Sequence, residues 1–181
     1  VNLAIDELER TGAFDRSWLM ITTPTGTGYG NYAAAGTLEF LSRGDCANVV
    51  LQYGARPSPI SLDRVSEGRT QARMLIDAIH EKLQTRPPEK QPTVVMFGES
   101  LGAWSSQDAF IDQGTQGLVD AGIDYAIWIG TPMESKWKEE VLRVAEHAVR
   151  VSQEPGGPKV LVAEPDDNLN QIAVARKEVV R

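Results

Sequence analysis

The stretch Thr93-Val-Val-Met-Phe-Gly-Glu-Ser-Leu-Gly102 carries the strongest fold signal in the sequence. Residues 93–97 form a short apolar run with β-branched side chains, which predicts a buried strand. A helix is predicted over residues 101–111. The pattern G-x-S-x-G, from Gly98 to Gly102, therefore falls at a strand-to-helix turn, where glycines on both sides of the serine let strand and helix approach without a side-chain clash.

The rest of the chain repeats this alternation of strand and helix. Strands are predicted at residues 18–23, 47–53, 125–129 and 159–163, and helices at 32–43, 72–83, about 135–150 and 169–179. Five apolar strands alternating with helices predict an α/β fold, with a doubly wound, mainly parallel sheet covered by helices on both faces. A length of 181 residues is that of one domain, so a single domain over residues 1–181 is expected.

Composition narrows the class of protein. With 41% hydrophobic and 24% charged residues, the chain is outside the ranges of disordered, collagen-like and membrane-embedded proteins. A net charge of −7 disfavours nucleic acid and anionic lipid as partners. One cysteine and two histidines exclude an internal disulfide and a His-rich metal site, so neither a metal nor a cofactor is expected.

The longest uncharged stretch, residues 17–38, does not predict a membrane span. Pro24 and four glycines within it would leave backbone groups without partners in lipid. The first residue is Val1 rather than methionine, which suggests a processed chain or a piece of a longer one.

Ser100 is the candidate nucleophile, because such a turn at the carboxyl end of the sheet exposes its hydroxyl to a crevice. The backbone N–H of Leu101, at the helix start, would be one donor to an oxyanion. Thr25 or Gly26, in the glycine-rich loop after the first strand, would supply the second. Two alternatives stay open: Ser100 as a small turn residue, and the loop as a solvent-exposed connection. A dinucleotide site is disfavoured, since the loop lacks the third glycine of its fingerprint.

A hydrolase of this kind also needs an acid and a histidine. Asp166 or Asp167, after the fifth predicted strand, could orient an imidazole or could cap the next helix. His80 and His147 each lie late in a predicted helix, far from the carboxyl edge of the sheet, so neither is expected to serve Ser100. The catalytic histidine is therefore expected outside this chain, beyond Arg181.

Several blocks together resemble an alpha/beta-hydrolase catalytic-domain family found mainly in actinobacteria. They are Glu7-Leu-Glu-Arg-Thr-Gly-Ala-Phe-Asp-Arg16, Thr23-Pro-Thr-Gly-Thr-Gly28, Leu38-Glu-Phe-Leu-Ser-Arg-Gly-Asp45, Leu51-Gln-Tyr53 and Phe97-Gly-Glu-Ser-Leu-Gly102.

The resemblance implies an α/β-hydrolase fold, possibly truncated at its carboxyl end, with Ser100 as nucleophile, the Thr25-Gly26 loop at the oxyanion hole and Asp167 as triad acid. Related chains often carry membrane helices before this domain, which implies a soluble domain of a membrane-associated protein. The sequence departs from the family where Asn168 replaces a usual proline and where the histidine-bearing segment is absent.

The expected function is that of a serine hydrolase, an esterase, thioesterase or lipase-like enzyme acting on a small-molecule or lipid ester. The alternative is a catalytically inactive α/β-hydrolase-like module that binds a ligand or is tethered to a membrane.

Overall fold

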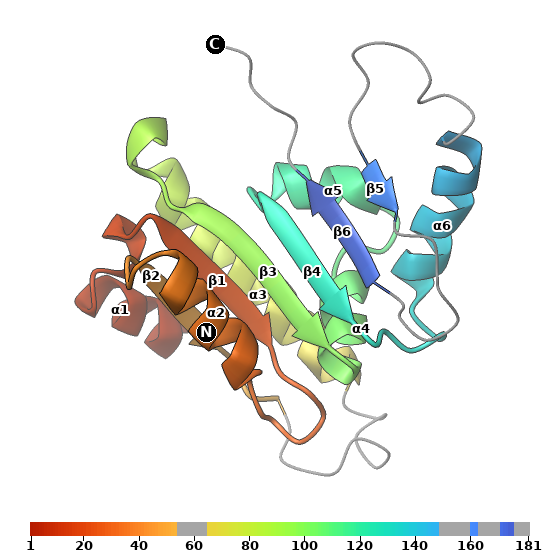
Figure 1. Cartoon of the computed structure of the whole chain (residues 1–181), viewed down its shortest axis with the longest axis horizontal. Coiled ribbons are helices and arrows are strands. Elements are labelled where there is room, and N and C mark those ends of the chain that lie inside the picture. The colour runs from red at the N-terminus through yellow and green to blue at the C-terminus, as the bar shows by residue number, and fades with distance from the viewer. Residues whose placement is uncertain (54–64, 149–159, 163–170, 176–181) are drawn as a thin grey trace.

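A six-stranded sheet forms the centre of the computed structural model, which describes residues 1–53, 65–148, 160–162 and 171–175. The strand order is β2-β1-β3-β4-β6-β5 (Figure 1). Strands β2, β1, β3 and β4 run parallel, whereas β6 is antiparallel to both β4 and β5. The strands are β1 (Trp18–Thr23), β2 (Cys46–Val50), β3 (Thr93–Glu99), β4 (Tyr125–Ile129), β5 (Val160–Val162) and β6 (Gln171–Ala175).

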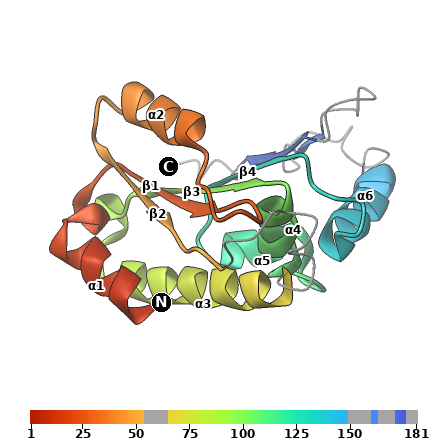
Figure 2. The same ribbon diagram turned by 90° about the horizontal axis from the view of Figure 1, so that it is seen from below.

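Helices lie on both faces of the sheet, which confirms the doubly wound α/β prediction. Figure 2 shows α2 on one face and α1, α3, α4 and α5 on the other. The helices are α1 (Asn2–Arg10), α2 (Tyr32–Leu41), α3 (Val65–Gln84), α4 (Leu101–Asp108), α5 (Gly114–Asp120) and α6 (Lys136–Ala148), with single 3₁₀ turns η1 (Ala13–Asp15) and η4 (Pro88–Lys90).

Successive side chains of the central strands point to opposite faces of the sheet. On β3, Val94 and Met96 join the large core beneath α1 and α3, while Val95 and Phe97 join a smaller cluster beneath α2. Met20 of β1 belongs to the same smaller cluster. Because both faces of these strands are covered, their sequences are continuous apolar runs rather than alternating ones.

The predicted helix over residues 169–179 is wrong, because Gln171–Ala175 forms strand β6. Its β-branched residues pair with the edge of β4, in the register Trp128↔Ile172 and Ala126↔Val174. This pairing joins residues more than forty positions apart, so a local apolar period does not reveal it. The sheet is therefore parallel over four strands only, and β5, which falls where a strand was predicted, lies at the far edge rather than beside β4.

Two short helices were not predicted, and the longest helix is longer than expected. α1 and α5 fall in segments that had no predicted structure. α3 begins at Val65 rather than at Ala72 and buries Gly68.

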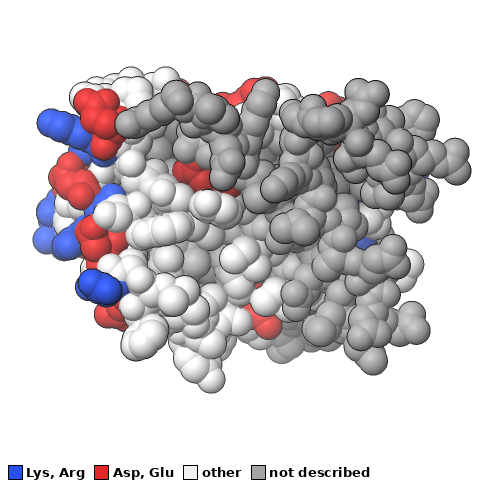
Figure 3. All heavy atoms as spheres, turned by 45° about the horizontal axis from the view of Figure 1, so that its top comes forward, with Lys and Arg blue, Asp and Glu red and all other residues white. Residues whose placement is uncertain are grey.

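The described surface carries charges of both signs. Figure 3 shows acidic and basic side chains interspersed at the left end of one face, where α1 lies in Figure 1. One ion pair between two helices joins Lys82 Nζ of α3 to Glu9 Oε1 of α1 at 2.6 Å. Within the described ranges, no helix combines the length and the apolar character needed to cross a bilayer.

Candidate active site

The crevice at the carboxyl ends of β1 and β3 is the natural ligand site of this topology. β1 is followed by α2 on one face of the sheet, and β3 by α4 on the other. The chain also changes direction here, since β2 lies on one side of β1 and β3 on its other side. Doubly wound sheets bind ligands at this switch point, outside the carboxyl ends of the strands. The loop over residues 24–31 and the Ser100 turn both lie at it.

Ser100 has a backbone conformation that is rare for a residue with a side chain. Its φ is 54° and its ψ is −122°, outside the common regions for L-residues, and such a conformation costs of order 1–3 kcal/mol. Its N–H donates to the carbonyl of Ile129 at 2.9 Å, which fixes the turn against the end of β4. The residue is partly exposed, and its hydroxyl makes no capping hydrogen bond to α4.

Gly98 and Gly102 are required because the atoms around them approach too closely to leave room for a side chain. A Cβ on Gly102 would lie 2.2 Å from the carbonyl oxygen of Thr23 and 2.5 Å from that of Pro24. A Cβ on Gly98 would lie 2.8 Å from Thr23 Oγ1 and 2.9 Å from the backbone of Ala103. The start of α4 therefore packs directly on the end of β1, and the Ser100 turn adjoins the loop that follows β1.

The first turn of α4 supplies backbone donors at this crevice. Leu101 is its first residue, and N–H groups in the first turn of a helix lack intrahelical acceptors and lie at the positive end of the helix dipole. In the neighbouring loop, the N–H of Thr25 donates to the carbonyl of Tyr29 at 3.2 Å, and the N–H of Gly28 donates to the carbonyl of Thr25 at 2.8 Å. The Thr25 amide is thus engaged within a closed turn in this structure.

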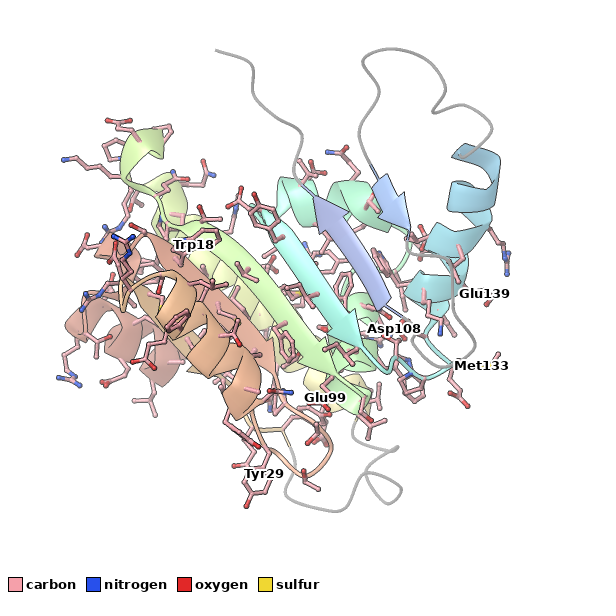
Figure 4. The ribbon with its side chains drawn as sticks, viewed as in Figure 1. Trp18, Tyr29, Glu99, Asp108, Met133 and Glu139 are labelled. Carbon is pink, nitrogen blue, oxygen red and sulfur yellow. The ribbon has the colours of Figure 1, made fainter. Side chains whose placement is uncertain are left out.

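A side-chain contact ties that loop to the Ser100 turn. Asn31 Nδ2 donates to Glu99 Oε2 at 2.9 Å, while Asn31 Oδ1 accepts from the N–H of Ala34 at 2.9 Å. Figure 4 shows Glu99 at the carboxyl end of β3, near the loop whose exposed tip carries Tyr29. The sequence analysis missed this role of Glu99, because nothing in the sequence pairs it with Asn31, 68 residues earlier.

Buried polar groups anchor the far side of α4. Asp108 Oδ1 accepts from Ser135 Oγ at 3.1 Å and from the N–H of Trp137 at 3.2 Å, and Asp108 Oδ2 accepts from Trp104 Nε1 at 2.9 Å. These bonds fasten α4 to the start of α6.

Burial raises the pKa of Tyr53 to about 12, an effect that the neighbouring Ser105 opposes.

The structure brings only some of the predicted site residues together. Ser100, Leu101 and the Thr25-Gly26 segment share the carboxyl edge. Asp166 and Asp167 lie outside the described residues. His80 lines a hollow with Thr93 and Asp124, at the amino ends of β3 and β4, which is the edge opposite Ser100.

In the described part of the chain, the remaining polar positions add no further ligand set. His147 belongs to the last turn of α6, a helix that follows the carboxyl end of β4. Among the residues whose placement is described, no group of three or more His, Cys, Asp or Glu is arranged to hold a metal ion.

The sequence was compared with known proteins in three ways, and one comparison gave a match. The searches of the curated proteins and of the solved structures found no match. A family model described as "Alpha/beta-hydrolase family" matches residues 1–163, which is most of the chain and includes Ser100 and the Thr25-Gly26 segment but not Asp166 or Asp167. This match agrees with the doubly wound sheet and with the strand-turn-helix at Ser100. The chain therefore belongs to the alpha/beta-hydrolase family.

Proposed function

We propose that the protein is a serine hydrolase that cleaves esters or thioesters with Ser100 as nucleophile. The observation that carries the proposal is the Ser100 turn itself. A serine is held at φ 54° between two glycines that have no room for a Cβ, at the switch point of the sheet. A strained backbone of this kind places the hydroxyl at the rim of the crevice, where a substrate carbonyl can reach it. Family membership indicates a hydrolase-type function.

The chemistry follows from the groups at this edge. Ser100 Oγ attacks the carbonyl carbon, and the new O–C bond converts the carbonyl oxygen to an oxyanion. The N–H of Leu101 donates to that oxyanion, and the second donor is an N–H of the Thr25-Gly26 segment, where the N–H of Thr25 would have to leave the carbonyl of Tyr29. As the C–O bond to the alcohol (or the C–S bond to the thiol) breaks, the hydroxyl proton passes through a base to the leaving group. Water then repeats the attack on the acyl-enzyme.

Ser100 needs a base, and we assign the orienting acid to Asp167. Among the described residues, His80 is the only histidine with a defined side chain, and it lies at the opposite edge of the sheet. An imidazole must therefore reach Ser100 from elsewhere in the native protein. Without one, turnover falls by orders of magnitude even when the serine is in place.

Covalent labelling with a fluorophosphonate tests the nucleophile. Labelling is expected in the unmodified protein and lost in Ser100→Ala, whereas Ser66→Ala, which removes an exposed serine hydroxyl of α3, should label normally. In a form of the protein that includes the base, hydrolysis of p-nitrophenyl acetate should fall in Ser100→Ala by about 10³-fold or more. Equal labelling of Ser100→Ala and the unmodified protein would refute the assignment. If a form of the protein that includes the base does not react at all, the inactive binding module is the better description.

A further inference from the structure

Lys138, in the first turn of α6, is a charged side chain that the fold buries. It is 9% exposed, and it is the only buried lysine or arginine among the described residues. Lysines are almost never buried unless a carboxylate pairs with them. In the part of the chain that the structure describes, no carboxylate forms an ion pair with Lys138, and its ammonium group makes one hydrogen bond, from Nζ to the carbonyl oxygen of Thr131 at 3.3 Å. One neutral acceptor does not offset the desolvation of a charge, so this ammonium group opposes folding.

The backbone of Lys138 is held firmly at the start of α6. Its N–H donates to Ser135 Oγ at 3.2 Å, and Ser135 Oγ donates to Asp108 Oδ1 of α4 at 3.1 Å. The preceding residue, Trp137, is fully buried and packs against Trp128 of β4, with ring centroids 5.0 Å apart. Nζ therefore extends to Thr131 from a fixed base.

The acceptor of Lys138 belongs to the connection between β4 and α6, residues 130–135. Thr131 is 4% exposed, and among the described contacts its carbonyl accepts no other hydrogen bond. A buried carbonyl needs a donor, and the ammonium group supplies it. Met133 of the same connection is 87% exposed, and Figure 4 shows it toward the same edge of the sheet as Glu99, the residue before Ser100. Lys138 thus holds the buried start of a connection that follows the site-bearing edge of the sheet.

The same connection is joined to the candidate nucleophile. Two residues before Thr131, the carbonyl of Ile129 accepts the N–H of Ser100 at 2.9 Å and fixes the strained turn. Gly130 lies between them with a φ of 62°, and a Cβ there would meet nothing within 4 Å. Because no neighbour limits rotation at this glycine, the chain can pivot there. The bond from Lys138 restrains the far side of that pivot.

We propose that Lys138 is a positioning residue of the Ser100 site. By holding Thr131, its ammonium group keeps the Ile129 carbonyl in the place that orients Ser100. The inference rests on the proposed function, because the orientation of Ser100 matters for reaction only if its hydroxyl is the nucleophile. Lys138 makes no hydrogen bond to Ser100, so it is not the missing base. A charge that costs stability is expected where function requires it, and a shift of about 1 Å at a reacting group can lower a rate by about a hundredfold.

Two methionine substitutions on the same turn of α6 test the role. Lys138→Met keeps an unbranched apolar side chain and removes the ammonium group, whereas Lys136→Met makes the same change at an exposed position. In a form of the protein that includes the base, the limiting rate constant for fluorophosphonate labelling of Ser100 should fall about tenfold or more in Lys138→Met and stay constant in Lys136→Met. The probe concentration that gives half of the limiting rate should change little, because no group that touches the probe is removed. Lys138→Arg, which keeps a charged donor, should recover part of the lost rate.

Urea denaturation separates positioning from support of the fold. The midpoint of Lys138→Met should equal or exceed that of the unmodified protein, because methionine removes a buried charge. A midpoint that falls together with the labelling rate would make Lys138 a structural residue and overturn the proposal. An unchanged labelling rate in Lys138→Met would overturn it as well.

Hydrogen exchange measured by mass spectrometry tests the restraint without any reaction of Ser100. Peptides that contain Ser100 or residues 130–135 should exchange faster in Lys138→Met than in the unmodified protein and in Lys136→Met, while peptides of α3 should not change. Labelling that does not depend on Ser100 would refute the proposed function itself. Labelling that depends on Ser100, with rate and exchange both unchanged in Lys138→Met, would refute this inference alone.

Discussion

At the scale of single residues, Gly102 is the position where one added atom has the largest expected effect. In Gly102→Ala, the new Cβ would overlap two backbone carbonyl oxygens, those of Thr23 and Pro24, at 2.2 and 2.5 Å. Neither oxygen can move without displacing the end of β1, so we expect a loss of about 3 kcal/mol or more in the free energy of unfolding. Urea denaturation measures the loss, and Ser100 labelling should decline with it.

Gly36 of α2 is the matched control for Gly102. A Cβ there meets nothing within 4 Å, and the residue is in the middle of a helix. Gly36→Ala should therefore raise the free energy of unfolding by about 0.5–1 kcal/mol, because alanine has the higher helix propensity. If Gly102→Ala destabilised the protein no more than Gly36→Ala does, α4 would not pack as closely on β1 as described here.

At the scale of elements, the start of α2 joins a helix cap to the candidate site through Asn31. Asn31→Ser keeps an oxygen for the N–H of Ala34 but loses the amide that bonds Glu99, whereas Asn31→Ala loses both contacts. Each contact should contribute about 1 kcal/mol to the free energy of unfolding, so urea denaturation should rank the unmodified protein above Asn31→Ser and Asn31→Ala last.

The rate of Ser100 labelling distinguishes a contribution to the site from one to the helix alone. Asn31→Ser should label more slowly than the unmodified protein if the Glu99 contact positions the loop. Glu99→Gln, which keeps an acceptor oxygen for the Asn31 amide, should label at close to the unmodified rate. If the labelling rates of the variants only follow their free energies of unfolding, Asn31 acts as a helix cap and does not position the loop.

The elements that the sequence predicts well are those whose signals are local. Asn31 directly precedes the predicted helix over residues 32–43 and is a residue type that caps helices, and its side chain does accept the N–H of Ala34. The strand at β3 and its glycine-flanked turn follow from apolar residues and glycines alone. By contrast, β6 depends on pairing with β4, and the Glu99 contact depends on a residue across the sheet. Such non-local contacts leave no periodic trace in one sequence.

At the scale of the whole molecule, the sheet's two faces are covered unequally. Helices α1, α3, α4, α5 and α6 contribute to the core on one face, whereas α2 lies on the other (Figure 2). On the α2 side, Tyr32 is 89% exposed and Phe40 is 84% exposed, and Ile127 of the sheet is 44% exposed. This side therefore exposes apolar groups to the solvent beside the crevice that contains the candidate site.

The overall charge should control whether these apolar groups bring molecules together. At pH 7 the net charge of −7 keeps molecules apart, but near the isoelectric point of about 4.9 that repulsion vanishes. Sedimentation velocity should therefore show association that increases from pH 7 to pH 5. The double substitution Tyr32→Ser and Phe40→Ser changes no charge and should suppress the association, because it removes the two most exposed aromatic side chains of α2. Far-UV circular dichroism at both pH values controls for acid unfolding. If the double variant associates as the unmodified protein does, the contact lies elsewhere on the molecule and the α2 face takes no part in it.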